Sequence, residues 1–115
     1  MHELSLAQEV LDLVRAAGQR DGFHRVGRLR LEVGALSGVD VEALCFALEA
    51  VAPGTCLAQA QILIDTPPGT AWCEECAQHV AITSYRDTCP GCTAPLTRHS
   101  GGDGLRVIDL LVHDD

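Results

Sequence analysis

Two pairs of cysteines constrain this chain more than any other feature of its sequence. Cys73 and Cys76 form one CxxC pair, Cys89 and Cys92 form a second, and twelve residues separate the pairs. Each pair brings two thiolates to one ion, and the stretch between the pairs is long enough to return the chain as a hairpin. Four sulfur ligands suit a tetrahedral Zn²⁺ in a closed structural site. The alternative is two disulfides or redox dithiols, which this spacing favours less.

Length and charge limit the remaining choices. A chain of 115 residues predicts one domain, or one domain with a small insert. The formal net charge is −8, and the eight basic residues include no Lys. Nucleic-acid binding rests chiefly on phosphate neutralisation by Lys and Arg, so this balance argues against a nucleic-acid partner. Four aromatic residues are too few to predict an aromatic-lined ligand pocket.

The expected location is cytoplasmic. The start of the chain lacks the basic segment and the long apolar segment of a signal peptide. No apolar run approaches the roughly 20 residues that a membrane helix needs, so no membrane association is expected. Cysteines spaced for a metal also fit a reducing compartment better than a secreted disulfide scaffold.

The hydrophobic pattern predicts two helices. Ser5 and Gln8 form a capping box, so the first helix is expected to begin at Ser5 and to end near Gly22. Asp40 is well placed to cap a second helix, which Pro53 and Gly54 should end. The apolar face of this second helix includes Cys45, which is expected in the core.

Three strands complete the predicted domain. The first runs from Val26 to Val33 and has one wet face, and the second centres on residues 60–64. Residues 100–104 are expected to be a flexible return linker. Apart from Asp109, Leu105 to Val112 are apolar on both alternating faces, which is typical of a central strand in a covered sheet.

The predicted fold class is α+β. Two helices should pack on a small three-stranded sheet, and a zinc-ribbon-like module should be inserted before the last strand. The expected domain boundaries are 1–69 plus 101–115 for the α/β domain and 70–100 for the zinc-binding module.

The chain opens Met1-His2-Glu3, which predicts a second metal site. A histidine at position two offers the terminal amine, its own backbone amide and imidazole Nδ1, which close two chelate rings around one ion. This nitrogen plane suits Ni²⁺ or Cu²⁺ better than tetrahedral Zn²⁺. A fourth ligand could come from Glu3 or Asp40. The alternatives are a solvated His2 and an Asp40 that serves only as a helix cap.

Two further residues carry weaker signals. His79 follows Cys76 by three positions and could replace a thiolate or attract a second ion, although four cysteines already complete a zinc site. Cys56 follows a Pro-Gly-Thr turn and receives no predicted role.

Taken together, the Met1-His2-Glu3 start, the two CxxC pairs and the Gly104-Leu105 return strand resemble the HypA/HybF family of hydrogenase maturation nickel metallochaperones. The resemblance covers essentially the whole chain. It implies that His2 is a nickel ligand, that Met1, Glu3 and Asp40 are secondary nickel candidates, and that the four cysteines hold structural Zn²⁺, with Ni²⁺ as cargo. It also implies two partners, a hydrogenase maturation GTPase and the large subunit of [NiFe]-hydrogenase. Because some family members also supply nickel to urease, urease maturation proteins are further candidate partners.

The primary functional hypothesis is therefore a carrier and not an enzyme. The sequence shows no phosphate-cradling glycine loop and no nucleophile elbow, and a four-cysteine zinc site leaves no open position to activate water. The competing hypothesis is a zinc-ribbon adaptor that only binds proteins, in which case Met1-His2-Glu3 would be incidental.

Overall fold

The computed structural model of the protein describes residues 2–113. The chain divides into two compact units. The first comprises Met1–Leu31, Val39–Ile64 and Val107–Asp115, and the second comprises Glu32–Gly38 and Asp65–Arg106. In the part of the chain that is described, no helix combines the length and the apolar character needed to cross a membrane.

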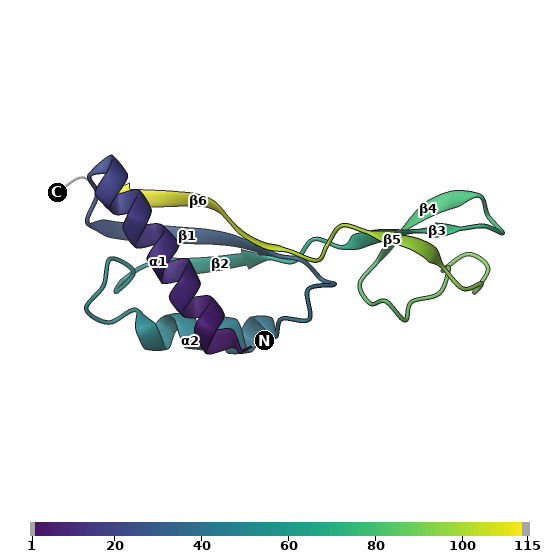
Figure 1. Cartoon of the computed structure of the whole chain (residues 1–115), viewed down its shortest axis with the longest axis horizontal. Helices are drawn as coiled ribbons and strands as arrows, with labels where there is room; N and C mark the ends of the chain where they lie inside the picture. Colours follow the sequence, from purple (N-terminus) through teal and green to yellow (C-terminus); the bar gives the residue numbers. More distant parts are fainter. Residues whose placement is uncertain (1, 114–115) are drawn as a thin grey trace. The chain divides into compact units, whose positions relative to one another are not determined.

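Helix α1 spans Glu3–Asp21 and therefore begins two residues earlier than the capping box predicted (Figure 1). His2 occupies the N-cap position, and its carbonyl accepts the first helical hydrogen bond from Leu6 at 3.2 Å. Two features favour the earlier start: the acidic Glu3 suits the positive end of the helix dipole, and its carboxylate accepts a hydrogen bond from the distant Asp40 N–H at 3.3 Å. At the other end, Gly22 adopts φ 83°, and its N–H closes the helix on the Gly18 carbonyl at 2.7 Å.

Helix α2 spans Val41–Val51, and the predicted cap is confirmed. Asp40 Oδ1 accepts a hydrogen bond from the Ala43 N–H at 3.1 Å, which satisfies one of the unpaired donors of the first turn. The prediction that Cys45 lies in the core is wrong, because its side chain is only half-buried. The buried residues of α2 are Leu44, Ala47 and Leu48.

The first sheet has the order β2-β1-β6, from Gln61–Asp65, Arg25–Val33 and Leu105–His113 (Figure 1). The predicted wet face of β1 is confirmed by ion pairs between strands, Arg30 with Asp109 at 3.9 Å and Arg106 with Glu32 at 3.3 Å. Helices α1 and α2 pack against each other, and their buried side chains form the core of the first unit together with those of β1.

The expectation that the last strand is central is wrong. Strand β6 lies at the edge of its sheet and β1 occupies the centre. None of the β6 residues is fully buried, and the Leu111 side chain is 52% exposed. An apolar run indicates a strand, but its neighbours in the sheet depend on long-range pairing that the run does not encode.

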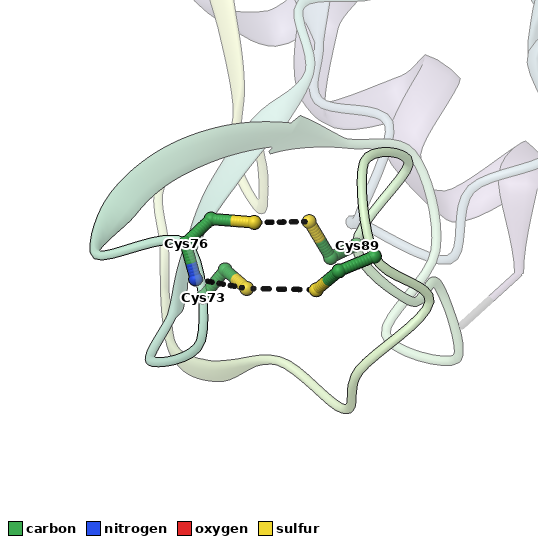
Figure 2. Close-up of side chains that lie close together, drawn as sticks. Cys73, Cys76 and Cys89 are labelled. Atoms are coloured by element: carbon green, nitrogen blue, oxygen red, sulfur yellow. Dashed lines mark hydrogen bonds between the residues drawn. The ribbon is translucent and has the colours of Figure 1, made fainter.

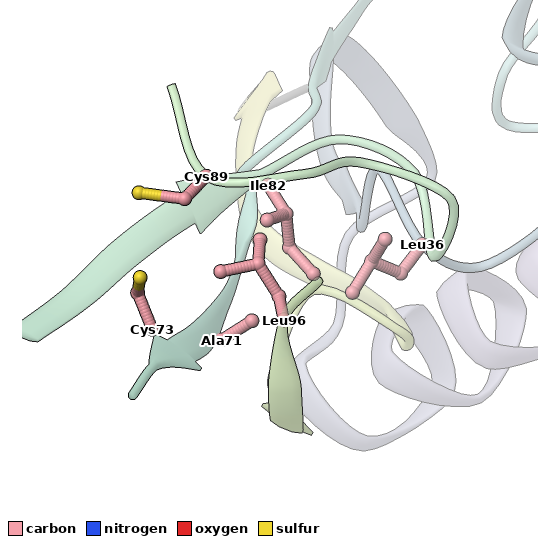
Figure 3. Close-up of a cluster of buried hydrophobic side chains, with 6 residues drawn as sticks. All are labelled: Leu36, Ala71, Cys73, Ile82, Cys89 and Leu96. Atoms are coloured by element: carbon pink, nitrogen blue, oxygen red, sulfur yellow. The ribbon is translucent and has the colours of Figure 1, made fainter. Parts of the chain in front are cut away.

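The second unit holds a separate sheet of order β4-β3-β5, from Gln78–Ile82, Gly69–Cys73 and Thr97–Ser100. Strands β3 and β4 are antiparallel, in register from Gly69 opposite Ile82 to Cys73 opposite Gln78. One side of this sheet covers a small core (Figure 3). That core consists of Leu36, Ala71, Cys73, Ile82, Cys89 and Leu96.

Three glycines allow three chain segments of the second unit to approach closely. A Cβ on Gly34 would collide with the carbonyl of Gly102, and a Cβ on Gly102 would collide with the backbone of Gly69. The segment 100–104, expected to be a flexible linker, is instead hydrogen-bonded. The Gly102 carbonyl accepts from Leu36 N–H at 2.6 Å, and the Gly104 carbonyl accepts from Gly34 N–H at 2.8 Å.

Candidate metal centre

The four cysteines of the two CxxC pairs come together in the second unit. Their sulfur atoms all lie within 4.8 Å of one another. Cys73 Sγ lies 3.5 Å from Cys92 Sγ, and Cys76 Sγ lies 3.9 Å from Cys89 Sγ. Figure 2 shows the sulfurs of the labelled Cys73, Cys76 and Cys89 turned toward the inside of the cluster. Cys73 ends β3, and the other three lie in the two turns that follow β3 and precede β5.

These distances fit a metal site and exclude disulfides. A disulfide requires two sulfurs about 2.05 Å apart, and all four thiols are free. Four sulfurs about 2.3 Å from a central ion form a tetrahedron whose edges are about 3.8 Å. The two sulfur–sulfur distances of 3.5 and 3.9 Å bracket that value. The donor set therefore fits a closed tetrahedral site for a thiophilic ion.

Local hydrogen bonds shape both turns around the sulfurs. The Cys76 N–H donates to Cys73 Sγ at 3.3 Å, which folds the first CxxC pair back on itself. In the second turn, the Cys89 carbonyl accepts from Thr93 N–H at 2.7 Å. Thr93 has φ 62° and Ala77 has φ 52°, so each turn contains a non-glycine residue in the left-handed region. Such strain persists where the surrounding structure enforces it.

The site combines two buried and two exposed thiols. Cys73 and Cys89 are buried, whereas Cys76 and Cys92 are exposed. The buried pair also belongs to the hydrophobic core of this unit, as Figure 3 shows. The metal-binding residues are thus part of the packing that supports them.

Hydrogen bonding separates the acidities of the thiols. Backbone N–H groups of Gly91 and Cys92 lower the pKa of Cys89 to about 7 because they stabilise its thiolate. Hydrogen bonds shared with Cys92, Cys73 and Cys89 raise the pKa of Cys76 to about 12. Metal binding requires thiolates, so an ion entering this cluster would displace protons.

His79 does not join the cysteines. Its ring packs edge-on against Trp72, with centroids 4.9 Å apart, and the two residues are paired across β3 and β4. Within residues 2–113, the four cysteines have ligand atoms close enough together to share a metal ion, and no histidine belongs to that group. This geometry agrees with the interpretation that His79 is not a ligand in this cluster.

The proposed nickel residues lie at the start of α1 and α2. His2 is exposed, and its side chain makes no capping hydrogen bond to the helix. The structure brings Glu3 and Asp40 together, because the Asp40 N–H donates to Glu3 Oε2 at 3.3 Å. Met1, the remaining candidate, lies outside the described residues. The side chains of His2, Glu3 and Asp40 do not form a compact three-ligand group in the described chain.

The sequence patterns did not predict that Leu36 belongs to the hydrophobic core that supports the cysteine cluster. Leu36 lies in the loop between β1 and α2, yet its buried side chain belongs to the same hydrophobic cluster of the second unit as Cys73 and Cys89. No periodic pattern marks a single apolar residue in a loop. The one sequence feature nearby that could indicate this packing is Gly34, because a glycine allows another backbone segment to approach closely.

Comparisons with known proteins agree with this architecture. Residues 1–112 match the family model described as "Hydrogenase/urease nickel incorporation, metallochaperone, hypA". The chain is 49% identical over 115 residues to the hydrogenase maturation factor HypA of Polaromonas naphthalenivorans, with both chains fully covered. It is 50% identical over 114 residues to the HypA of Cupriavidus necator, covering 99% of this chain and 96% of that one.

Solved structures support the fold. The solution structure of the Ni metallochaperone HypA from Helicobacter pylori matches with a TM-score of 0.68 at 18% identity, and both chains are fully covered. A second HypA solution structure matches with a TM-score of 0.66 at 19% identity, covering 98% of this chain and 97% of that one. Because residues 1–112 match the family model and two HypA proteins are 49% and 50% identical to this chain, the chain belongs to the HypA family of hydrogenase and urease nickel incorporation metallochaperones.

Proposed function

We propose that this protein binds Ni²⁺ at its N-terminus and helps deliver it to the large subunit of [NiFe]-hydrogenase during maturation. The observation that carries the proposal is the match of residues 1–112 to a nickel incorporation family. In this view the protein is a carrier and not a catalyst. It holds nickel firmly enough to exclude the free ion and releases it to a recipient.

The nickel ligands are the Met1 amine, the His2 backbone amide and His2 Nδ1. Nitrogen donors in one plane suit the square geometry that Ni²⁺ accepts. His2 supports this role because its exposed side chain is not used to cap α1. Glu3 is the first residue of α1 and lies beside Asp40, so a carboxylate oxygen of either residue could supply the fourth ligand.

Glu3 and Asp40 support the site by holding the N-terminal residues in place. The Glu3 carboxylate accepts from the Asp40 N–H, and Asp40 Oδ1 accepts from Ala43. These two hydrogen bonds use one oxygen of each carboxylate and leave Glu3 Oε1 and Asp40 Oδ2 out of the contact. A recipient can then replace the donors one at a time from the solvent side.

The four cysteines would hold Zn²⁺ as a structural ion, one sulfur from each of Cys73, Cys76, Cys89 and Cys92. When bound, such an ion links two turns that the small core alone holds weakly. The two metals thus divide between the units, with nickel in the first and zinc in the second. The partners in this proposal are a maturation GTPase and the hydrogenase large subunit in the cytoplasm, with urease maturation as a second destination.

A nickel titration tests the proposal. Ni²⁺ is titrated by calorimetry into zinc-loaded protein with a native N-terminus, into His2→Ala, and into protein with one residue added before Met1. About one nickel ion per chain is expected for the native protein, and both variants should lose the site. His24→Ala is the matched control, because His24 is also exposed but lies outside the proposed ligands. Equal uptake by all four proteins would contradict the proposal and favour the zinc-ribbon adaptor.

A further inference from the structure

Phe46 is the most exposed of the large apolar side chains in the described chain. It lies on α2 with 74% of its surface accessible, whereas Leu44 and Leu48 of the same helix are fully buried. Phe46 follows the buried Leu44 by two residues, which is about 200° around the helix, so its side chain points away from the core. An aromatic ring on the outer face of a packed helix loses favourable burial unless a partner covers it.

Carboxylates flank this ring along the helix. Glu42 precedes Phe46 by four residues and Glu49 follows it by three, so both lie beside it on the same helix face. Both glutamates are exposed. The outer face of α2 therefore presents an apolar centre with a negative border. We call these three residues the Phe46 face.

The Phe46 face lies close to the residues proposed to position nickel. Asp40 precedes Phe46 by six residues, which is about 9 Å along a helix axis. Asp40 in turn contacts Glu3, next to His2. A molecule that covered Phe46 would therefore lie within a short distance of the nickel-loading end of α1.

We propose that the Phe46 face docks a protein partner whose surface presents an apolar recess bordered by Arg or Lys. The proposal rests on the proposed carrier function, since it identifies where a participant in nickel transfer would bind. A second copy of this chain fits poorly, because pairing two Phe46 faces would bring Glu42 and Glu49 of both copies together. An anionic lipid surface fits poorly for the same electrostatic reason.

The test measures binding of the purified hydrogenase maturation GTPase from the same organism by calorimetry. Phe46→Ala should weaken binding about tenfold or more, as truncation of an aromatic anchor does, and Phe46→Leu should restore part of the loss. Glu42→Gln with Glu49→Gln should reduce both the affinity and its dependence on salt. Leu13→Ala is the matched control. Leu13 is a 59% exposed apolar residue beside Glu9 and Asp12, three turns from the start of α1.

The outcomes separate this proposal from the carrier function. Phe46→Ala should still bind about one nickel ion per chain and keep the unfolding midpoint of the unmodified protein. If it retains affinity for the GTPase, or if Leu13→Ala loses as much, the Phe46 face is not the docking surface, while nickel binding through His2 stands. Phe46-dependent dimerisation, or Phe46-dependent sedimentation with anionic vesicles, would also overturn it. Failure of the unmodified chain to bind the GTPase would overturn this proposal together with that partner assignment.

Discussion

The backbone N–H of Asp40 donates a hydrogen bond to Glu3 Oε2 at 3.3 Å, across 37 positions of sequence. This contact ties the first turn of α1 to the N-cap of α2. The donor is the N–H of the residue just before α2. The acceptor is a carboxylate whose negative charge is also stabilised by the positive end of the α1 dipole. The proposed nickel residue His2 is thereby attached to a fixed helix end and not to a free tail.

The N-cap at Asp40 predicts a stability change. Asp40→Ala removes the acceptor of the Ala43 N–H and should lower the free energy of unfolding by about 1 kcal/mol. Asp40→Asn keeps an oxygen in the same place and should change the free energy of unfolding by only a few tenths of a kcal/mol. Urea unfolding followed by circular dichroism measures both. A loss as large for Asn as for Ala would show that the negative charge matters more than the capping hydrogen bond.

Zinc content should depend on the clustered cysteines alone. Cys73→Ser removes one of four ligands and a buried member of the core, so zinc should fall well below one ion per chain and the second unit should lose stability. Cys45→Ser provides the control, since Cys45 is only half-buried and lies outside the four-cysteine group. Elemental analysis after dialysis gives the answer. Full zinc content in the Cys73 variant would disprove its assignment as a ligand.

Nickel affinity should fall as the pH is lowered. The proposed ligands bind as a neutral amine, a neutral imidazole and a deprotonated amide, so protons compete with Ni²⁺ for each of them. Titrations between pH 8 and pH 6 should show steadily weaker binding for the native protein and little uptake at any pH for His2→Ala. An affinity independent of pH over this range would argue for carboxylate ligands such as Glu3 and Asp40 in place of the nitrogen set.

The crossing of chain segments in the second unit predicts a large difference between two glycines. Gly34→Ala places a methyl group against the Gly102 carbonyl and should cost about 1–3 kcal/mol of unfolding free energy, because backbone must move. A Cβ on Gly104 meets nothing within 4 Å. Gly104→Ala should therefore be neutral or stabilise the protein by up to about 1 kcal/mol. Thermal unfolding of the two variants would refute this account if their midpoints were equal.

The local features of the fold could be predicted from the sequence because each depends on residues close together in the chain. The Asp40 cap, the Gly22 helix end and the alternation of Arg30 and Glu32 are of this kind. Capping boxes are also local, but Ser5 and Gln8 predicted the wrong helix start. A contact from Asp40 holds Glu3, and no local pattern contains that contact.

The candidate metal centre was partly predictable for the same reason. Two CxxC spacings are short-range patterns, and the four sulfurs do meet as that spacing implied. The role of Met1 and His2 as nickel ligands is a different case. It rests on the N-terminal motif and on the resemblance to a family, and it stays a prediction until nickel is measured.

By itself, the sequence determined the order of the helices and strands of the first unit, the Asp40 cap of α2, and which four side chains can share an ion. Those properties follow from backbone preference and from ligands a few residues apart. Only the tertiary structure decided that β6 lies at an edge, that Leu36 joins the core that contains Cys73 and Cys89, and that Glu3 meets Asp40. Each of these depends on segments far apart in the chain, whose pairing is selected by the packing of the whole unit.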